Sequence, residues 1–124
     1  MSLMVDTSIA LWVLADSPKL SSASRKRLTD SPVCYISAIS IAEIEIKRSI
    51  GKLTIDASYR EALVESGFLL MPFEGRDARH LGDLPYHHKD PFDRMLISQA
   101  MERKMPIITA DDSFSRYPVD VHLN

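Results

Sequence analysis

Short apolar runs alternate with segments of helical periodicity along the sequence, and this alternation restricts the possible folds more than any other feature. The apolar runs predict five strands, at residues 3–5, 33–36, 68–71, 106–109 and 119–123. Helical periodicity fills most of the intervening chain, and successive parallel strands need such crossover segments between them. The pattern therefore predicts an α/β fold around a parallel sheet.

The length and composition fit one domain spanning residues 1–124. A domain usually needs about 100–150 residues, and no linker or repeat divides the 124 residues. No apolar stretch approaches the ~20 residues of a membrane span, and a signal peptide is not evident. With Cys34 as the one cysteine, no intrachain disulfide can form. We therefore expect a cytoplasmic protein that uses no membrane, in which Cys34 is a structural thiol.

Two aspartates follow predicted strands. Asp6 stands just beyond residues 3–5, and Asp111 just beyond residues 106–109. Ligands of open α/β sheets bind in the crevice at the carboxyl ends of the strands. We therefore expect Asp6 and Asp111 to share one crevice.

Two further acids lie on apolar helix faces. Glu43 falls on the same face as Ile39, Ile46 and Ile50, at spacings of four, three and four residues. Asp93 shares the face of Ile97 and Ala100 in the first turn of its predicted helix. A solvated acid is not expected on such a face.

Acids gathered in a partly apolar site repel one another and need a neutralising partner. Carboxylates without paired His or Cys favour Mg²⁺ or Mn²⁺, and such ions promote phosphoryl transfer. The spacing alone leaves other roles open: Asp6 could simply cap a helix, Asp93 could be a first-turn acid favoured by the helix dipole, and Asp111 could be a turn residue.

Four segments in this order resemble the PIN-domain ribonucleases, and more narrowly the VapC toxins of bacterial toxin–antitoxin pairs. The most specific segment is HKDPFDRMLISQA at residues 88–100. The others are MVDTS at 4–8, YISAIS, AEIEIK and GKL within 35–53, and IITADDSF at 107–114.

The resemblance implies a three-layer α/β/α sandwich with a central, mostly parallel five-stranded sheet. It implies an endoribonuclease that depends on Mg²⁺ or Mn²⁺, acts as a toxin, forms a homodimer and is blocked by a cognate antitoxin. The four family acids fall on Asp6, Glu43, Asp93 and Asp111, which are thus the expected catalytic and metal-binding residues. Glu45 lies on a different helix face from Glu43 and is expected to be solvated.

Several polar residues could support these acids. We expect Thr7 or Ser8 to cap the first helix or to position a metal-bound water, and Thr109 to orient a carboxylate unless it is only a strand residue. Asp90 could lie at the rim of the site, one turn before Asp93. The adjacent histidines of the preceding loop, His87 and His88, are expected to be solvated rather than to bind zinc.

Basic residues could contact RNA phosphates, although the net charge of −2 provides no general basic field. Lys47 and Arg48 end one helix and could equally form a solvated face, whereas Arg94 adjoins Asp93 and is the stronger candidate. Trp12 belongs either to the core or to a groove for an antitoxin peptide.

Two other functions fit the sequence less well. A phosphatase of the haloacid dehalogenase type would need a second aspartate where Ser8 stands, and no segment supplies the acceptor aspartate and later lysine of a phospho-receiver domain. A catalytically weak PIN-like module that binds RNA or protein remains the alternative, against which the presence of all four acids argues.

Overall fold

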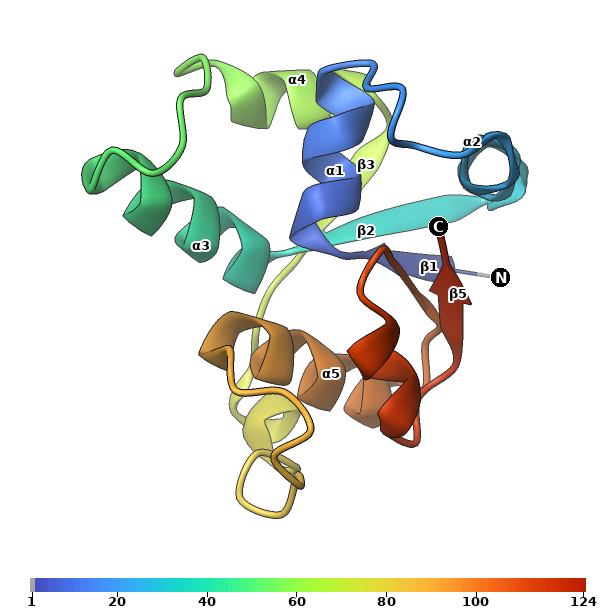
Figure 1. Cartoon of the computed structure of the whole chain (residues 1–124), viewed down its shortest axis with the longest axis vertical. Helices are drawn as coiled ribbons and strands as arrows, with labels where there is room; N and C mark the ends of the chain where they lie inside the picture. The colour runs from blue at the N-terminus through green and yellow to red at the C-terminus, as the bar shows by residue number, and fades with distance from the viewer. Residues whose placement is uncertain (1) are drawn as a thin grey trace.

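Five parallel strands form the centre of the structure, a computed structural model that describes residues 2–124 (Figure 1). The strands are β1 (Ser2–Val5), β2 (Val33–Ser37), β3 (Phe68–Met71), β4 (Ile107–Thr109) and β5 (Val121–Leu123). They lie in the order β3-β2-β1-β4-β5, and every neighbouring pair is parallel. The predicted five-stranded α/β sheet is confirmed.

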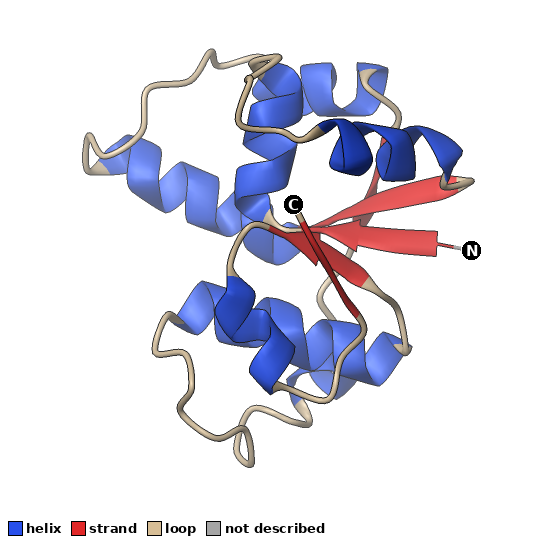
Figure 2. Ribbon diagram, turned by 45° about the vertical axis from the view of Figure 1, so that its right-hand side comes forward, coloured by secondary structure: helices blue, strands red, loops and turns tan. Residues whose placement is uncertain are grey.

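Helices cover both faces of this sheet and complete the predicted three-layer sandwich (Figures 1 and 2). One face carries α1 (Thr7–Leu14), α2 (Ser22–Asp30), α3 (Ala38–Ser49) and α4 (Tyr59–Glu65). The other carries α5 (Pro91–Arg103) and the short 3₁₀ helices η1 (Gly75–Ala78) and η2 (Asp112–Arg116). Within residues 2–124, no helix combines the length and apolar character needed to cross a membrane.

Alternation along the strands divides the core in two. Leu3 and Val5 of β1 pack in the cluster under α1, α3 and α4, whereas Met4 packs in the cluster under α5. Ile108 and Ile107 of β4 divide in the same way. Because successive strand side chains point to opposite faces, one apolar run supplies both cores.

Polar side chains set the starts of the helices that carry the candidate site. Ser37 caps α3 by accepting the amide of Ile39 at 3.1 Å. Asp90 caps α5, and Pro91 occupies the first turn, where its missing N–H costs nothing.

The helix α4 begins at Tyr59. The Asp56 carboxylate accepts the Ser58 amide at 2.8 Å and holds the preceding chain in a local turn. Gly67 follows α4 at a φ of 98°, a conformation that a residue with a Cβ adopts only with strain.

Candidate active site

Asp6 and Asp111 meet where β1 and β4 lie side by side. Val5 pairs with Ile108, and the Asp6 amide donates to the Ile108 carbonyl at 2.9 Å. The chain continues from β1 to β2 on one side and reaches β4 on the other, so this is the point at which the strand order reverses. Ligands of α/β sheets bind at such a point.

An open cleft of about 440 Å³ lies at this edge, and we call it the acidic cleft. Its charged lining consists of one lysine, Lys47, and six carboxylates, namely Asp6, Glu43, Asp90, Asp93, Asp111 and Asp112. A larger cavity of about 600 Å³ lies elsewhere, but its one charged lining residue is Arg25, and the residues around it are mostly apolar or hydroxylic. The concentration of carboxylates identifies the acidic cleft as the candidate site.

Asp6 is buried and held by two donors. It caps α1, with Oδ1 accepting the Thr7 amide at 2.7 Å, and its Oδ2 accepts the Thr109 hydroxyl at 2.7 Å. Burial raises the pKa of Asp6 above its usual value, although these hydrogen bonds oppose the shift. Asp6 therefore both caps α1 and belongs to the acidic cleft. Ser8 does not cap the helix; it is exposed and lines the cleft.

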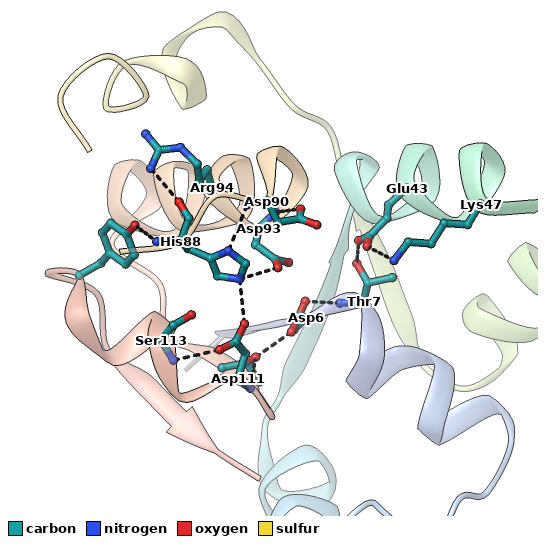
Figure 3. A network of polar contacts seen from close by, with 12 residues as sticks. Asp6, Thr7, Glu43, Lys47, His88, Asp90, Asp93, Arg94, Asp111 and Ser113 are labelled. Atoms are coloured by element: carbon teal, nitrogen blue, oxygen red, sulfur yellow. Dashed lines mark hydrogen bonds and ion pairs between the residues drawn. The ribbon is translucent and has the colours of Figure 1, made fainter. Parts of the chain in front are cut away.

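Glu43 reaches the cleft from α3 and is only 5% exposed. Its Oε1 accepts the Thr7 hydroxyl at 2.7 Å, and its Oε2 lies 2.7 Å from Lys47 Nζ. The Thr7 hydroxyl also lies 2.8 Å from the hydroxyl of Ser40. Thr7 thus positions a carboxylate on another helix, rather than capping its own as one prediction had it (Figure 3).

Asp93 is supplied by the first turn of α5. Its amide donates to Oδ1 of Asp90 at 3.0 Å, which places Asp90 beside it at the rim of the acidic cleft. Burial first, and then the charges of Asp6, Asp90, Glu43 and Asp111, together raise the pKa of Asp93 to about 8. The carboxylates are therefore close enough to disfavour one another's ionisation.

Asp111 caps η2 and is the most exposed of the four predicted acids. Its Oδ1 accepts the Ser113 amide at 2.9 Å, and its amide donates to the Thr109 hydroxyl oxygen at 3.0 Å. Burial raises the pKa of Asp111, but hydrogen bonds from Ser113 and His88 outweigh burial and leave the pKa below its usual value.

The structure also brings His88 into the acidic cleft, which the sequence reasoning missed. The Nε2 atom of His88 lies 2.8 Å from Oδ2 of Asp93 and 2.8 Å from Oδ2 of Asp111. Figure 3 shows the ring pointing between these two carboxylates. The prediction that both histidines are solvated is wrong for His88, whereas His87 is exposed.

The donors of the acidic cleft fit a divalent cation. Carboxylate oxygens of Asp93 and Asp111 lie within 4.8 Å of each other. Asp6 accepts one hydrogen bond on each oxygen, which leaves further lone pairs free on both. Burial and the neighbouring carboxylates raise the pKa of Asp93, and a bound cation would oppose that shift. A set dominated by carboxylate oxygens suits a hard ion such as Mg²⁺ or Mn²⁺.

The three candidate RNA-binding residues lie in different surroundings. Lys47 lines the acidic cleft, whereas Arg48 pairs with Glu45 at 3.2 Å and stacks on Tyr59. Glu45 is exposed, as expected, and it also accepts a hydrogen bond from the Tyr59 hydroxyl at 2.6 Å.

Arg94 is buried, at 6% exposure, and its guanidinium does not face the cleft. It donates to the carbonyls of Pro85 at 3.0 Å, Leu84 at 3.1 Å and His88 at 3.2 Å. These contacts do not support the predicted contact with RNA. They show that Arg94 secures the loop that carries His88.

Trp12 and Cys34 are both half-buried. Trp12 packs against the core cluster under α1, which agrees with its expected place in the core, and it also lines the acidic cleft. Cys34 packs against the same cluster, and burial raises the pKa of its thiol, as expected of a structural cysteine.

Similarity to known proteins was found with one protein family and with several solved structures. The PIN domain family matches residues 3–120 of the chain. No curated protein sequence is significantly similar to it.

Several solved structures share the fold over nearly the full length of both chains. VapBC2 from Rickettsia felis, bound to a DNA fragment from its promoter, matches with a TM-score of 0.75 and 17% identity, over 99% of this chain and 98% of that one. DNA-bound VapBC from Salmonella typhimurium matches with a TM-score of 0.73 and 19% identity, over 98% and 97%. VapBC-1 from nontypeable Haemophilus influenzae matches with a TM-score of 0.72 and 19% identity, over 99% of this chain and 98% of that one.

Proposed function

The chain belongs to the PIN domain family, and from this premise we propose that it is a metal-dependent endoribonuclease, the toxin of a type II toxin–antitoxin pair. The observation that carries the proposal is the convergence of Asp6, Glu43, Asp93 and Asp111, far apart in sequence, on one cleft at the reversal of strand order. RNA is chosen as the substrate because four segments of the sequence resemble VapC toxins.

In this proposal Asp6, Asp93 and Asp111 hold a Mg²⁺ or Mn²⁺ ion, with Glu43 on the opposite wall of the cleft. A bound divalent ion supplies positive charge for the scissile phosphate and an acidified water at neutral pH. Thr109 orients Asp6 through its hydroxyl, and Thr7 orients Glu43. Such supporting contacts fix the direction in which each carboxylate presents its lone pairs.

The charge of the cleft explains why a cation is required before RNA can enter. Six carboxylates face one lysine there, so the cleft repels phosphate until a metal offsets part of the negative charge. Lys47 is the basic residue best placed to meet an RNA phosphate, because it lines the cleft and its side chain is 44% exposed. The enzyme would act in the cytoplasm, where such a toxin meets its RNA substrates.

A cognate antitoxin and a second copy of the chain are the proposed protein partners. The similar structures from R. felis and S. typhimurium are VapBC complexes, and we extend an antitoxin partner to this chain by that likeness. Exposed large apolar side chains on α3, at the residue that follows it, on α4 and on β3 are available for such interfaces. They are Ile46, Ile50, Val64, Leu69 and Leu70.

The test is cleavage of a mixed RNA substrate by the purified chain with Mg²⁺, with Mn²⁺ and with a chelator. The proposal predicts internal cleavage that the chelator stops and that Asp6→Asn removes while the protein stays folded. Asp120→Asn is the matched control, because Asp120 is exposed and lies outside the acidic cleft. Equal cleavage by Asp6→Asn and by the wild type would reject the site.

A further inference from the structure

His88 is inserted between two carboxylates of the acidic cleft, which is an unusual position for a side chain from a polar loop. Its Nε2 lies 2.8 Å from an oxygen of Asp93 and 2.8 Å from an oxygen of Asp111. The imidazole is only 16% exposed. Its ring also meets Phe114 edge to face, with the ring centres 6.0 Å apart. The side chain is therefore packed into the cleft.

The other ring nitrogen shows how His88 uses this position. Nδ1 accepts the backbone amide of Asp90 at 3.1 Å, so Nδ1 carries no proton and the ring proton is on Nε2. Nε2 consequently donates a hydrogen bond to Asp111 and places the same N–H group 2.8 Å from an oxygen of Asp93. A metal ligand must instead present a lone pair, so His88 in this arrangement is a donor to the carboxylates and not a ligand.

The backbone of His88 is fixed independently of its ring. Its amide donates to the Tyr117 hydroxyl at 2.9 Å, and its carbonyl accepts from Arg94 at 3.2 Å. The Tyr117 hydroxyl in turn donates to the Pro85 carbonyl at 2.7 Å. Rotation of the side chain toward solvent would break the polar contacts of the ring with Asp93, Asp111 and the Asp90 amide, while leaving these backbone contacts intact.

We propose that His88 is an autoinhibitory residue that competes with the divalent ion for the oxygens of Asp93 and Asp111. Its N–H group lies where those two carboxylates would otherwise share a cation, so the ring must rotate out before the ion can use both oxygens. This inference rests on the proposed function, because it assumes that Asp93 and Asp111 hold a metal. It makes His88 a determinant of metal affinity.

The size of the effect follows from the population of the inserted ring. If the ring occupies the cleft in about nine molecules of ten, the apparent affinity for the ion is about one tenth of the intrinsic affinity. Removing the imidazole should therefore raise the apparent affinity for the ion about tenfold. A metal-ligating histidine has the opposite effect, because its removal weakens binding.

The test is calorimetric titration of Mn²⁺ into the wild type, His88→Ala and His87→Ala. His87→Ala is the matched control, since His87 is the adjacent histidine and stacks edge-on against Tyr117 away from the carboxylates. We expect His88→Ala to bind Mn²⁺ about tenfold more tightly than the wild type and His87→Ala to bind like the wild type. Weaker binding by His88→Ala would identify a ligand, and unchanged binding would identify a bystander; either result overturns the proposal.

A measurement on the wild type keeps the test independent of how the variant folds. The ¹⁵N signals of the His88 ring should report a proton on Nε2 without metal, and should move toward those of a solvent-exposed ring when Mg²⁺ is added. A shift of the ring proton to Nδ1 on adding Mg²⁺ would show ligation through Nε2 and overturn the proposal. Unchanged ring signals at saturating Mg²⁺ would overturn it as well.

The titration also separates the two hypotheses. If neither the wild type nor His88→Ala binds Mn²⁺, the proposed metal site fails, and the role of His88 fails with it. If the wild type binds Mn²⁺ and Asp93→Asn does not, the metal site stands whatever His88→Ala shows.

Discussion

The hydroxyl of Thr109 donates to the carboxylate of Asp6 at 2.7 Å, joining two residues that are 103 positions apart in the sequence. The same hydroxyl oxygen accepts the Asp111 amide at 3.0 Å. One threonine at the end of β4 therefore fixes Asp6, which follows β1, and the backbone of Asp111, which follows β4. The geometry of the acidic cleft depends on this contact, although Thr109 itself is fully buried.

Thr109→Val should weaken metal affinity or activity by about 10- to 100-fold, because outer contacts to ligating carboxylates have effects of that size. Valine keeps the shape of the side chain but cannot donate to Asp6. Mn²⁺ titration and RNA cleavage should both show the loss, and Thr109→Ser, which keeps the hydroxyl, should recover most of it. If Val and Ser behave alike, the hydroxyl does not position Asp6.

Asp93→Asn should stabilise the metal-free protein at alkaline pH. Burial raises the pKa of Asp93 to about 8, so the folded state holds a proton that the unfolded state has already lost. The stability contributed by that proton is fully present below the unfolded pKa and is lost as the pH rises through about 8. We expect Tm to rise by about 5 °C in Asp93→Asn at pH 8.5.

The gain in Tm should be smaller at pH 5, where the wild-type carboxyl is already protonated in the folded state. Thermal unfolding of both proteins in chelator at the two pH values measures the difference, and other titrating groups largely cancel. A lower Tm for Asp93→Asn at pH 8.5 would contradict the account of the acidic cleft.

Arg94→Lys should lower stability without changing the charge contacts to RNA. Lysine cannot donate simultaneously to the carbonyls of Leu84, Pro85 and His88, and it loses the stacking on Tyr86, where the guanidinium carbon lies 3.9 Å from the ring centre. Buried groups left unpaired cost about 1–3 kcal/mol each. Calorimetric or optical melting should show the loss of stability directly.

The salt dependence of RNA binding separates this role from a phosphate contact. In an Asp6→Asn background, which leaves RNA uncut, Lys47→Ala should reduce the slope of log K against log salt by about one. Arg94→Lys should leave that slope unchanged. A reduction with Arg94→Lys but not with Lys47→Ala would reverse the two assignments.

Asp77→Asn should destabilise the face of the sheet covered by α5. The Asp77 side chain is fully buried and accepts from Arg103 Nε at 2.8 Å and from Arg103 Nη2 at 2.9 Å. Breaking a buried ion pair costs about 3 kcal/mol or more. Chemical denaturation should show this loss, whereas Glu74→Gln, at the exposed end of the same network, should cost less than about 1 kcal/mol.

The pH dependence of this ion pair has the opposite sign to that of Asp93. Arg103 holds the pKa of Asp77 below its usual value, so the stabilisation is present above the unfolded pKa and is lost as the pH falls through the lower folded value. The free energies of unfolding of Asp77→Asn and wild type should therefore converge in strong acid. A constant difference down to pH 2 would contradict the assignment.

The fold was predictable because each short apolar run in the sequence indicates a strand. Residues 68–71 form a strand in the structure as they do in the prediction, and period-two alternation in β1 supplies both cores. The helix starts were less predictable, because the competing caps are close together. Ser37 and Ser40 are both of a residue type that caps helices. In the structure Ser37 caps α3, and the Ser40 hydroxyl instead lies beside that of Thr7.

Glu43 was correctly expected to be unsolvated, but part of the reasoning was wrong. The apolar face that it shares with Ile46 and Ile50 is not a core face at its far end, since those residues are 47% and 59% exposed. Glu43 is buried because its side chain reaches Thr7 at the start of α1, where Oε1 accepts the Thr7 hydroxyl. A periodic pattern indicates one side of a helix but does not show how much of that side is covered.

The position of His88 beside Asp93 and Asp111 could not be predicted from the sequence. Two adjacent histidines in a polar loop indicate solvent exposure, and nothing local distinguishes His88 from His87. The distinction comes from Arg94 and Tyr117, which fix the loop backbone from α5 and from the segment after η2. The clustering of Asp6 with Asp111 was predictable in part because adjacent parallel strands end at the same edge of a sheet.

The central claim is that the acidic cleft holds a divalent ion through Asp6, Asp93 and Asp111. A crystal of the wild type soaked in Mn²⁺ tests it most directly, because the anomalous scattering of manganese locates the ion without reference to activity. The account predicts a peak inside the cleft with oxygens of at least two of these aspartates at about 2.2 Å, and a displaced His88 ring. No peak in the cleft, at a Mn²⁺ concentration that supports RNA cleavage, would contradict it.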